Sequence, residues 1–328
     1  MALTVQGVMD RQFVAARILP ILASLVLVAD ALAIDPGRVA VGDSVYVAVD
    51  GAELHVNGKP AARLQRKTEM RVLEVRDQWL GGAVVIDGAE KKGWLELAKV
   101  FKADDAGALA RLKGGALMLD RDFSGNVLEA TAAKPALSPG DLAALRGLYS
   151  LETLDLSETT IVDDDLKTLR GLTNLRRLYL ARTVITAHGL DPLSSLSRLE
   201  VLALGHTRVT GAGLTRLGKL PHLQVLNLSG CRIDDDDLAH LERFPGLRVL
   251  ALDGTLVRGR GLRHLQNLRQ LNLLNLNGCK LMNNAILSLR GLDDLRALYL
   301  DQAALDNATE GQLNRLLPQL AIIKRGSR

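Results

Sequence analysis

The side chains in this sequence that could act as nucleophiles, bases or metal ligands are few and scattered. There are two cysteines, Cys231 and Cys279, and six histidines, namely His55, His188, His206, His222, His240 and His264. Phosphate-binding loops, zinc-protease motifs, serine-hydrolase elbows and calcium loops each need several such residues at fixed spacing, and the sequence contains none of these patterns. We therefore expect a protein that is not an enzyme, with no metal site and no cofactor.

Two runs of aspartate, residues 163–165 and 234–237, are the densest groups of candidate metal ligands. One interpretation is calcium binding. The other is that these carboxylates cap helices, because acidic side chains at a helix N-terminus accept hydrogen bonds from free backbone N–H groups and suit the helix dipole. The two runs are too far apart in the chain to form one site, so we favour the second interpretation.

The composition narrows the class of protein further. Of 328 residues, 48% are hydrophobic and 24% are charged, which excludes a disordered chain and supplies enough material for a core. The net charge of +4 is a small excess over a long chain, so we expect no nucleic-acid partner. Aromatic residues make up only 3%, so the core must be aliphatic. Two cysteines are too few for a disulfide-rich scaffold.

The first 33 residues have the features of an export signal. Arg11 and Arg17 precede an apolar run at residues 18–29, and Ala31-Leu32-Ala33 follows with the small residues that a signal peptidase recognises. The run has 12 residues and is closed by Asp30, whereas a bilayer crossing needs about 20 apolar residues. We therefore predict cleavage after Ala33, an extracytoplasmic protein (periplasmic or secreted), and no membrane span after cleavage.

Residues 34–102 alternate short apolar stretches with turn pairs, which predicts five short strands and a small β-barrel. The motifs Val41-Gly42-Asp43, Trp79-Leu80 and Gly93-Trp94-Leu95 resemble those of bacterial SH3-like domains. That resemblance implies binding of peptides or cell-wall material, with Tyr46 and Trp79 as candidate contact residues. The alternative is that both tryptophans fill the barrel core.

From Val127 onward, the sequence repeats every 24 residues. Numbered from Leu151, the apolar positions of each repeat are 1, 4, 6, 11, 16, 19 and 22; in the first full copy they are Leu151, Leu154, Leu156, Ile161, Leu166, Leu169 and Leu172. Positions 4 and 6 share one side of a strand, and positions 16 and 19 share one face of a helix. Each repeat is thus predicted to be a strand plus a helix, and stacking the repeats buries one continuous core.

The order Leu-x-x-Leu-x-Leu-x-x-Thr/Cys-x-Ile resembles the signature of bacterial leucine-rich-repeat proteins. The resemblance implies an α/β solenoid at residues 127–328 with a C-terminal cap, preceded by a linker and N-terminal cap helix at residues 103–126. It also implies a polar ladder at position 9, which here reads Thr159, Thr183, Thr207, Cys231, Thr255, Cys279 and Ala303.

Stacking of the repeats also predicts which residues lie side by side. Arg258 and Arg260 fall one repeat after Asp234 and Asp236, so we expect acid beside base. Cys231 and Cys279 share position 9 two repeats apart, roughly 9–10 Å at the usual strand spacing, which is too far for a disulfide. We therefore expect two buried free thiols.

Strand positions 3 and 5 and exit position 8 should line the concave face of the solenoid. The centre of that face is apolar, Val225 and Val249 are predicted to project to solvent, and Tyr and Arg side chains stand at its ends, a composition typical of protein interfaces. The predicted function is non-catalytic binding of a protein or peptide; the alternative is cell-wall or polysaccharide attachment through the SH3-like domain with the repeats as a spacer. The candidate binding residues are Arg177, Tyr179, Arg182, Val201, His206, Val225, Asn227, Val249, Leu273, Asn275 and Tyr299.

Overall fold

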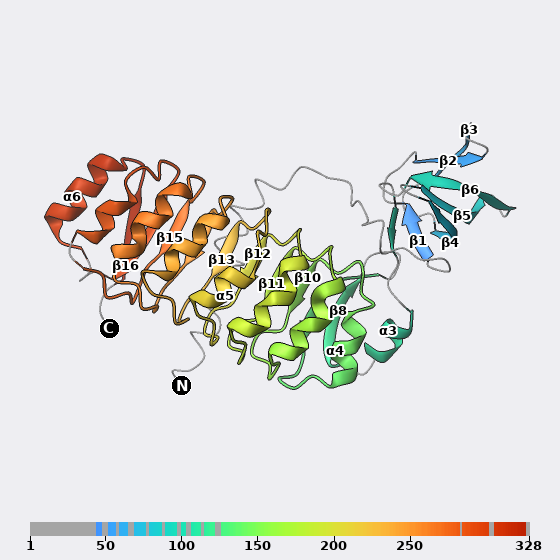
Figure 1. Cartoon of the computed structure of the whole chain (residues 1–328), viewed down its shortest axis with the longest axis horizontal. Coiled ribbons are helices and arrows are strands. Elements are labelled where there is room, and N and C mark those ends of the chain that lie inside the picture. Colours follow the sequence, from blue (N-terminus) through green and yellow to red (C-terminus); the bar gives the residue numbers. More distant parts are fainter. Residues whose placement is uncertain are drawn as a thin grey trace. The chain divides into compact units, whose positions relative to one another are not determined.

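The chain divides into two compact units between Ala103 and Asp104, and each is described by itself (Figure 1). The computed structural model describes residues 44–47, 52–56, 59–64, 69–76, 79–86, 89–96, 100–102, 106–112, 115–121, 126–282, 284–301 and 305–325. The predicted signal segment, the Val41-Gly42-Asp43 motif and Ala303 lie outside the described residues.

The first unit contains one antiparallel sheet of seven strands in the order β3-β2-β6-β5-β4-β1-β7. The strands are β1 (Ser44–Val47), β2 (Ala52–Val56), β3 (Lys59–Leu64), β4 (Glu69–Arg76), β5 (Trp79–Ile86), β6 (Ala89–Glu96) and β7 (Val100–Lys102). The predicted number of five strands was wrong. The edge strand β7 has only three residues, and the other edge strand, β3, carries Pro60, which is tolerated at a sheet edge; neither strand has the apolar alternation that would predict it.

Small residues allow close packing inside this sheet. Leu54, Met70 and Val72 are buried to 0% exposure. The Trp94 ring lies over Gly81, where an added Cβ would come within 3.1 Å of it. Gly82 is packed more tightly still, because an added Cβ would lie 2.6 Å from the backbone carbonyl oxygen of Arg71. A side chain at either glycine would therefore displace the Trp94 ring or the neighbouring strand.

The second unit contains a ten-stranded sheet in which the chain adds one strand per coil, from β8 to β17. From β9 to β17 all neighbouring strands are parallel, and paired residues on neighbouring strands are 24 residues apart in the sequence. For example, Leu226 pairs with Leu250. The predicted α/β solenoid is confirmed. Its strands are β8 (Leu117–Arg121), β9 (Val127–Ala132), β10 (Thr153–Asp155), β11 (Arg177–Tyr179), β12 (Val201–Ala203), β13 (Val225–Asn227), β14 (Val249–Ala251), β15 (Leu273–Asn275), β16 (Ala297–Asp301) and β17 (Ala321–Arg325).

Helices cover one face of this sheet, and Figure 1 shows them side by side from α4 to α6. They are α4 (Pro139–Leu145), η5 (Asp163–Gly171), η6 (Ala187–Ser195), α5 (Gly211–Arg216), η7 (Asp237–Arg243), η8 (Arg260–Asn267), η9 (Ala285–Leu289) and α6 (Asn307–Leu316). The five labelled η are 3₁₀-helices, with three residues per turn. The leucines at positions 16, 19 and 22 are three residues apart, so this tighter helix aligns them better than an α-helix would.

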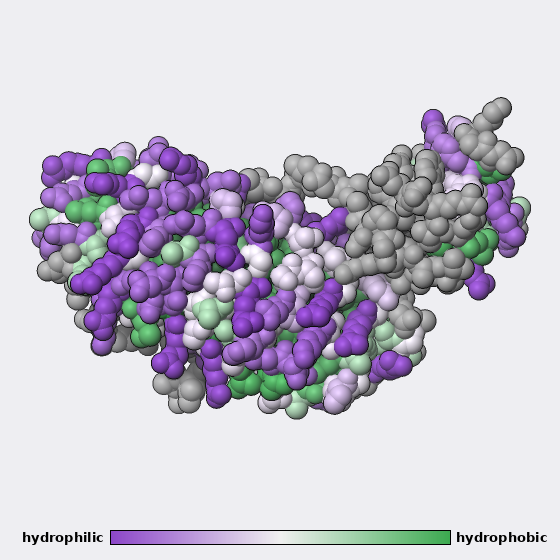
Figure 2. Space-filling view, viewed as in Figure 1, coloured by the Kyte–Doolittle hydropathy of each residue, from purple (hydrophilic) through white to green (hydrophobic). Residues whose placement is uncertain are grey.

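The leucines of all coils form one continuous core, in which Leu226 and Leu228 are 0% exposed. Figure 2 shows mostly hydrophilic side chains over the solenoid on the side turned to the viewer. None of the helices among the described residues has the length and apolar character that a bilayer crossing requires.

The N-terminal cap is larger than predicted. The segment expected to hold a linker and a helix contains α3 (Ala106–Arg111) and also β8, which pairs antiparallel with β9. β8 lies outside the 24-residue frame, so the repeat pattern could not reveal it. The antiparallel hairpin ends the parallel sheet on one side.

The position-9 ladder uses threonine and cysteine differently. The Thr207 hydroxyl donates to the Leu204 carbonyl of its own coil at 2.7 Å, whereas the Cys231 thiol donates to the same carbonyl from the next coil at 3.0 Å. Thr255, Cys279 and Leu252 repeat the arrangement at 2.6 and 3.1 Å. Both cysteines are free and buried, as predicted.

Candidate functional site

The face of the central strands that points away from the leucine core carries one line of apolar side chains. The parallel register places them side by side, and we call them the apolar row: Val201, Val225, Val249 and Leu273. They lie outside the continuous core, yet they are only 2–4% exposed. The prediction that Val225 and Val249 project freely to solvent was therefore wrong. Stacking against counterparts about 4.7–4.9 Å away on neighbouring strands accounts for part of this burial.

The asparagines beside the row are committed to the fold. Asn227 and Asn275 are 6% and 7% exposed. Each side-chain oxygen accepts a hydrogen bond from the N–H two residues later, at 2.9 and 3.1 Å, which fixes the turn at the strand exit. The Asn275 amide also donates to Asp253 at 3.0 Å, and the Ser229 hydroxyl donates to the same carboxylate oxygen at 2.5 Å. These amide groups stabilise the edge of the face and are already hydrogen-bonded within the fold.

Arg177, at the N-terminal end of the face, is already engaged within the solenoid. Its Nη2 lies 3.2 Å from a Glu129 carboxylate oxygen, and its Nε donates to the Thr153 hydroxyl at 2.8 Å. All three residues occupy position 3 of successive coils, so the repeat frame held the signal for this ladder. The guanidinium is thus held in one orientation while a third of the side chain stays exposed.

Tyr179 lies next to this ladder in β11 and is half-buried. Burial raises the pKa of its hydroxyl, the positive charge of Arg177 lowers it, and the negative charges of Asp155 and Glu129 raise it, with a net increase. The phenol therefore stays protonated at neutral pH and can donate a hydrogen bond. Tyr299 in β16, also half-buried, lies at the other end of the face.

Position 8 turns the chain sharply out of each strand. Arg182 and His206 are exposed there in the left-handed region, at φ 58° and 57°, and Gly230 follows at φ 65°. A Cβ at Gly230 would lie 2.4 Å from Nδ1 of His206, so the imidazole lies over this glycine. The His206 ring therefore packs against Gly230 at the edge of the face.

The two candidate contacts in the first unit lie on different strands. Tyr46 is in β1, where it pairs with Glu69 and Phe101, and Trp79 begins β5 opposite Arg76. β4 separates β1 from β5 in the sheet, so the backbones of Tyr46 and Trp79 are two strands apart.

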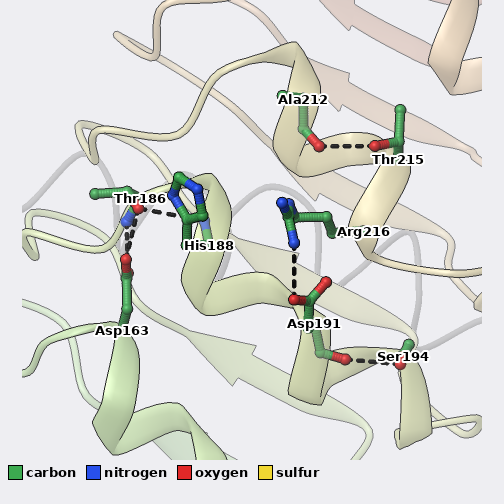
Figure 3. A network of polar contacts seen from close by, with 8 residues as sticks. All are labelled: Asp163, Thr186, His188, Asp191, Ser194, Ala212, Thr215 and Arg216. Atoms are coloured by element: carbon green, nitrogen blue, oxygen red, sulfur yellow. Dashed lines mark hydrogen bonds and ion pairs between the residues drawn. The ribbon is translucent and has the colours of Figure 1, made fainter.

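The first aspartate run caps a neighbouring coil on the helical side. Asp163 accepts hydrogen bonds from the N–H and hydroxyl of Thr186, and Thr186 in turn accepts from the His188 N–H (Figure 3). A Cβ at Gly189 would come within 2.5 Å of the Asp163 carboxylate, so glycine makes room for it. An ion pair of 2.8 Å between Arg216 and Asp191 links the next two coils in the same view.

The second run repeats this arrangement three coils later. Asp235 accepts from the backbone N–H groups of Arg258, Gly259 and Gly261 at 2.9–3.2 Å. Asp234 and Asp236 line one groove with Arg258 and Arg260, so acid lies beside base as expected, but none of the ion pairs within 4.0 Å among the described residues joins them. The capping interpretation is confirmed. Among the described residues, no group of three or more His, Cys, Asp or Glu side chains could hold a metal ion.

A leucine-rich-repeat family model matches residues 222–244, which hold β13 and η7. The other coils repeat the register of this one, so the second unit is a solenoid of leucine-rich repeats. A search of curated proteins gave no match to the chain.

Two solved structures illustrate the similarity. A leucine-rich-repeat protein of Leptospira interrogans is 23% identical over 55% of this chain and 44% of its own, with a TM-score of 0.44. The ectodomain of the Arabidopsis receptor kinase HAESA, in complex with a peptide hormone, is 20% identical over 68% of this chain and 41% of its own, with a TM-score of 0.49. The chain thus spans less than half the length of either.

Proposed function

We propose that this protein is a non-catalytic scaffold that binds a protein or peptide through the concave face of its leucine-rich repeats. The observation that carries the proposal is the set of half-buried tyrosines and exposed basic side chains that border the apolar row on the side of the sheet opposite to the leucine core, namely Tyr179, Arg182, His206 and Tyr299. A partner that contacts these side chains would lie over the row. Apolar centres with aromatic and arginine side chains around them are the usual composition of protein interfaces.

The contacts divide into a floor and two ends. The apolar row is the floor, and because its side chains are only 2–4% exposed it shapes the face but adds little contact area. Tyr179, Arg182 and His206 stand at the N-terminal end of the face, and Tyr299 stands at the other. Tyrosine combines a large apolar ring with a hydroxyl that can donate, so these half-buried side chains are the best anchors for a ligand.

The experiment is a selection of peptides from a random display library on the full chain, followed by titration of one selected peptide against variants. Tyr179→Ala or Tyr299→Ala should weaken binding about tenfold, because truncating an interface anchor costs about 1–2 kcal/mol. Tyr149→Ala removes a half-buried tyrosine of the solenoid that is not on this face and is the matched control. Unchanged affinity in both face variants, or an equal loss in the control, would place the interface elsewhere.

We further propose that the mature protein acts outside the cytoplasm after removal of residues 1–33. The support is the basic start, the 12-residue apolar run and the Ala31-Leu32-Ala33 site. Expression in a bacterial host and N-terminal sequencing of the exported protein should give Ile34 as the first residue. Recovery of the full-length chain from the cytoplasm alone would contradict the proposal.

For the first unit we propose an SH3-like domain. Its support is a sheet of short antiparallel strands and the Trp79-Leu80 and Gly93-Trp94-Leu95 motifs. Whether this unit binds cell-wall material is tested by sedimentation of the full chain with isolated cell wall. Loss of co-sedimentation in Trp79→Ala would support that role, and unaltered co-sedimentation would contradict it.

A further inference from the structure

A groove on the side of the solenoid, away from the apolar row, is lined by basic side chains. It has a volume of about 810 Å³ and lies where the chain passes from strand to helix in three successive coils. Arg258, Arg260, Arg263 and Lys280 line it, and all four are exposed. Leu256, 57% exposed, lies among them and gives the groove an apolar spot.

The basic side chains continue beyond the groove because a second backbone ladder runs along this side. The N–H groups of Arg208, Arg232 and Leu256, all at position 10, donate to position-11 carbonyls of the preceding coil at 2.9, 3.3 and 2.9 Å. This ladder keeps successive position-10 residues about one strand spacing, 4.7–4.9 Å, apart. Arg208 and Arg232 therefore follow one line, and Lys280 occupies the same repeat position two coils after Arg232. Together with the three groove arginines they form what we call the basic face.

The cations of the basic face are not neutralised by the fold. Across the described part of the chain, none of the six has an ion pair within 4.0 Å. Other cations of the solenoid do have one: Lys167 pairs with Asp164 at 2.7 Å, and Arg176 pairs with Glu200 at 2.6 Å. Long flexible side chains left unpaired in one line are available to an anionic ligand.

Two of the three neighbouring acids, Asp234 and Asp235, are turned toward the backbone. Asp235 accepts three N–H groups of the next coil, and one oxygen of Asp234 accepts the N–H groups of Asp236 and Asp237 at 3.1 and 3.2 Å. Four cations and three acids, Asp234, Asp235 and Asp236, line the groove, which leaves a net charge of +1, and Arg208 and Arg232 extend the positive charge beyond it. The exposed Asp236 remains able to accept a hydrogen bond from a ligand hydroxyl.

We propose that the basic face binds a linear anionic polysaccharide, whose carboxylate or sulfate groups contact the row of cations. Such a polymer combines anionic groups with hydroxyls for Asp236 and an apolar sugar-ring face for Leu256. A single-stranded nucleic acid fits less well, because the residues lining the groove include no aromatic ring on which bases could stack. The groove reaches the strand exits at Gly254 and Gly278, but none of the side chains proposed above as ligand contacts lines it, so this site is tested separately from the function proposed for the concave face.

The test is titration of the full chain with dextran sulfate and polygalacturonate, at low and high salt, with neutral dextran as the uncharged polymer. The triple variant Arg232→Gln, Arg258→Gln, Lys280→Gln should bind the anionic polymers about tenfold more weakly than the natural chain and lose part of the salt dependence. All three side chains are exposed, so the thermal melt should stay unchanged.

The matched control removes the same charge from the other side of the coils. Lys219→Gln, Arg269→Gln, Arg290→Gln changes three exposed cations near helix ends and should alter affinity by less than about twofold. Equal losses of affinity in the two triple variants would mean that binding depends only on the net charge of the chain, which would overturn the proposed site. Binding of an oligonucleotide more tightly than either polysaccharide would overturn the ligand class, and binding of neutral dextran with the same affinity would overturn the role of charge.

Discussion

Leu226 and Val225 are neighbours in β13, and both are buried, yet they belong to different parts of the molecule. Leu226 points into the continuous core, where the described coils carry an apolar residue, most often leucine, at its repeat position. Val225 points to the opposite side, where the same position holds Thr153, Arg177 or Ala297 in other coils. The comparison separates the positions that hold the coils together from those free to differ between coils, and ligand specificity can reside only in the second set.

The largest effect expected from this comparison is on stability. Leu226→Ala should lower the free energy of unfolding by about 2–5 kcal/mol, because it leaves a cavity in a closed core. Val225→Ala should cost about 1–2 kcal/mol, since it removes two methyl groups worth about 0.8 kcal/mol each. Gln224→Ala, at a half-exposed position, should stay within about 0.5 kcal/mol. Urea melts of the three variants measure the order of these losses in the free energy of unfolding. Equal losses for Val225→Ala and Leu226→Ala would mean that both side chains belong to one core.

The next effect concerns glycines that let coils approach each other. Gly261→Ala should destabilise the protein by about 1–3 kcal/mol, because the added Cβ would lie 2.0 Å from the Asp235 carbonyl oxygen. Gly171→Ala is the matched control: nothing lies within 4 Å of its added Cβ, and no gain or loss beyond about 1 kcal/mol is expected. If both variants melt like the natural protein, the close approach of the coils at Asp235 is not needed for stability.

A smaller effect on stability is expected at the cysteines, which belong to the same continuous core as Leu226. Cys231→Ala should cost about 1 kcal/mol through the lost hydrogen bond to the Leu204 carbonyl. Burial raises the pKa of both thiols, so the reactive thiolate is scarcer in the folded protein than in the unfolded one at the same pH. Labelling by a thiol reagent should be slow until denaturant is added. Fast labelling of the native protein at pH 8 would contradict the assigned burial.

The smallest effect concerns Asp237, at the start of η7. Burial raises the pKa of this carboxyl, chiefly by disfavouring the ionised form, and the charge of Asp234 adds to the shift. Its folded pKa therefore lies above its unfolded pKa, so its contribution to stability declines as pH rises through this range. Asp237→Asn should gain up to about 0.5 kcal/mol at neutral pH and show a steeper rise of stability with pH on the acid side, because the opposing contribution of Asp237 is removed. A loss of stability at pH 7 would mean that its hydrogen bond to the Asp234 N–H outweighs the charge.

The 24-residue frame predicted the register of the central strands, because leucines at fixed positions reveal which residues must share a core. It also contained the ladder of Glu129, Thr153 and Arg177, which occupy one position in three successive coils. It could not predict the burial of Val225, because valine is common on both exposed and buried faces of a strand. Nor could it give the partners of Asp235, because these depend on how far each coil is rotated against the next.

The other misses have related causes. β8 pairs antiparallel with β9 and lies outside the repeat, so the periodic pattern did not predict it. The basic face combines positions 10, 12, 14 and 17 of different coils, and its three cations at position 10 are interrupted by Leu256, so the frame shows no unbroken basic column. The positive φ of Arg182 and His206 was predictable in principle, because Gly230, Gly254 and Gly278 occupy the same position in later coils.

The central claim, that a ligand lies on the face opposite to the leucine core, is tested most directly by disulfide trapping. A cysteine is placed at half-buried Ala297 in β16, on the concave face, or at exposed Asn267 on the helical side, and each full chain is mixed with a selected peptide that carries an activated disulfide. The native thiols are buried and should react slowly. Ala297→Cys should couple at least about tenfold faster to the selected peptide than to its scrambled version, while Asn267→Cys should not distinguish them. Preferential coupling at Asn267→Cys, or none at Ala297→Cys, would contradict the account.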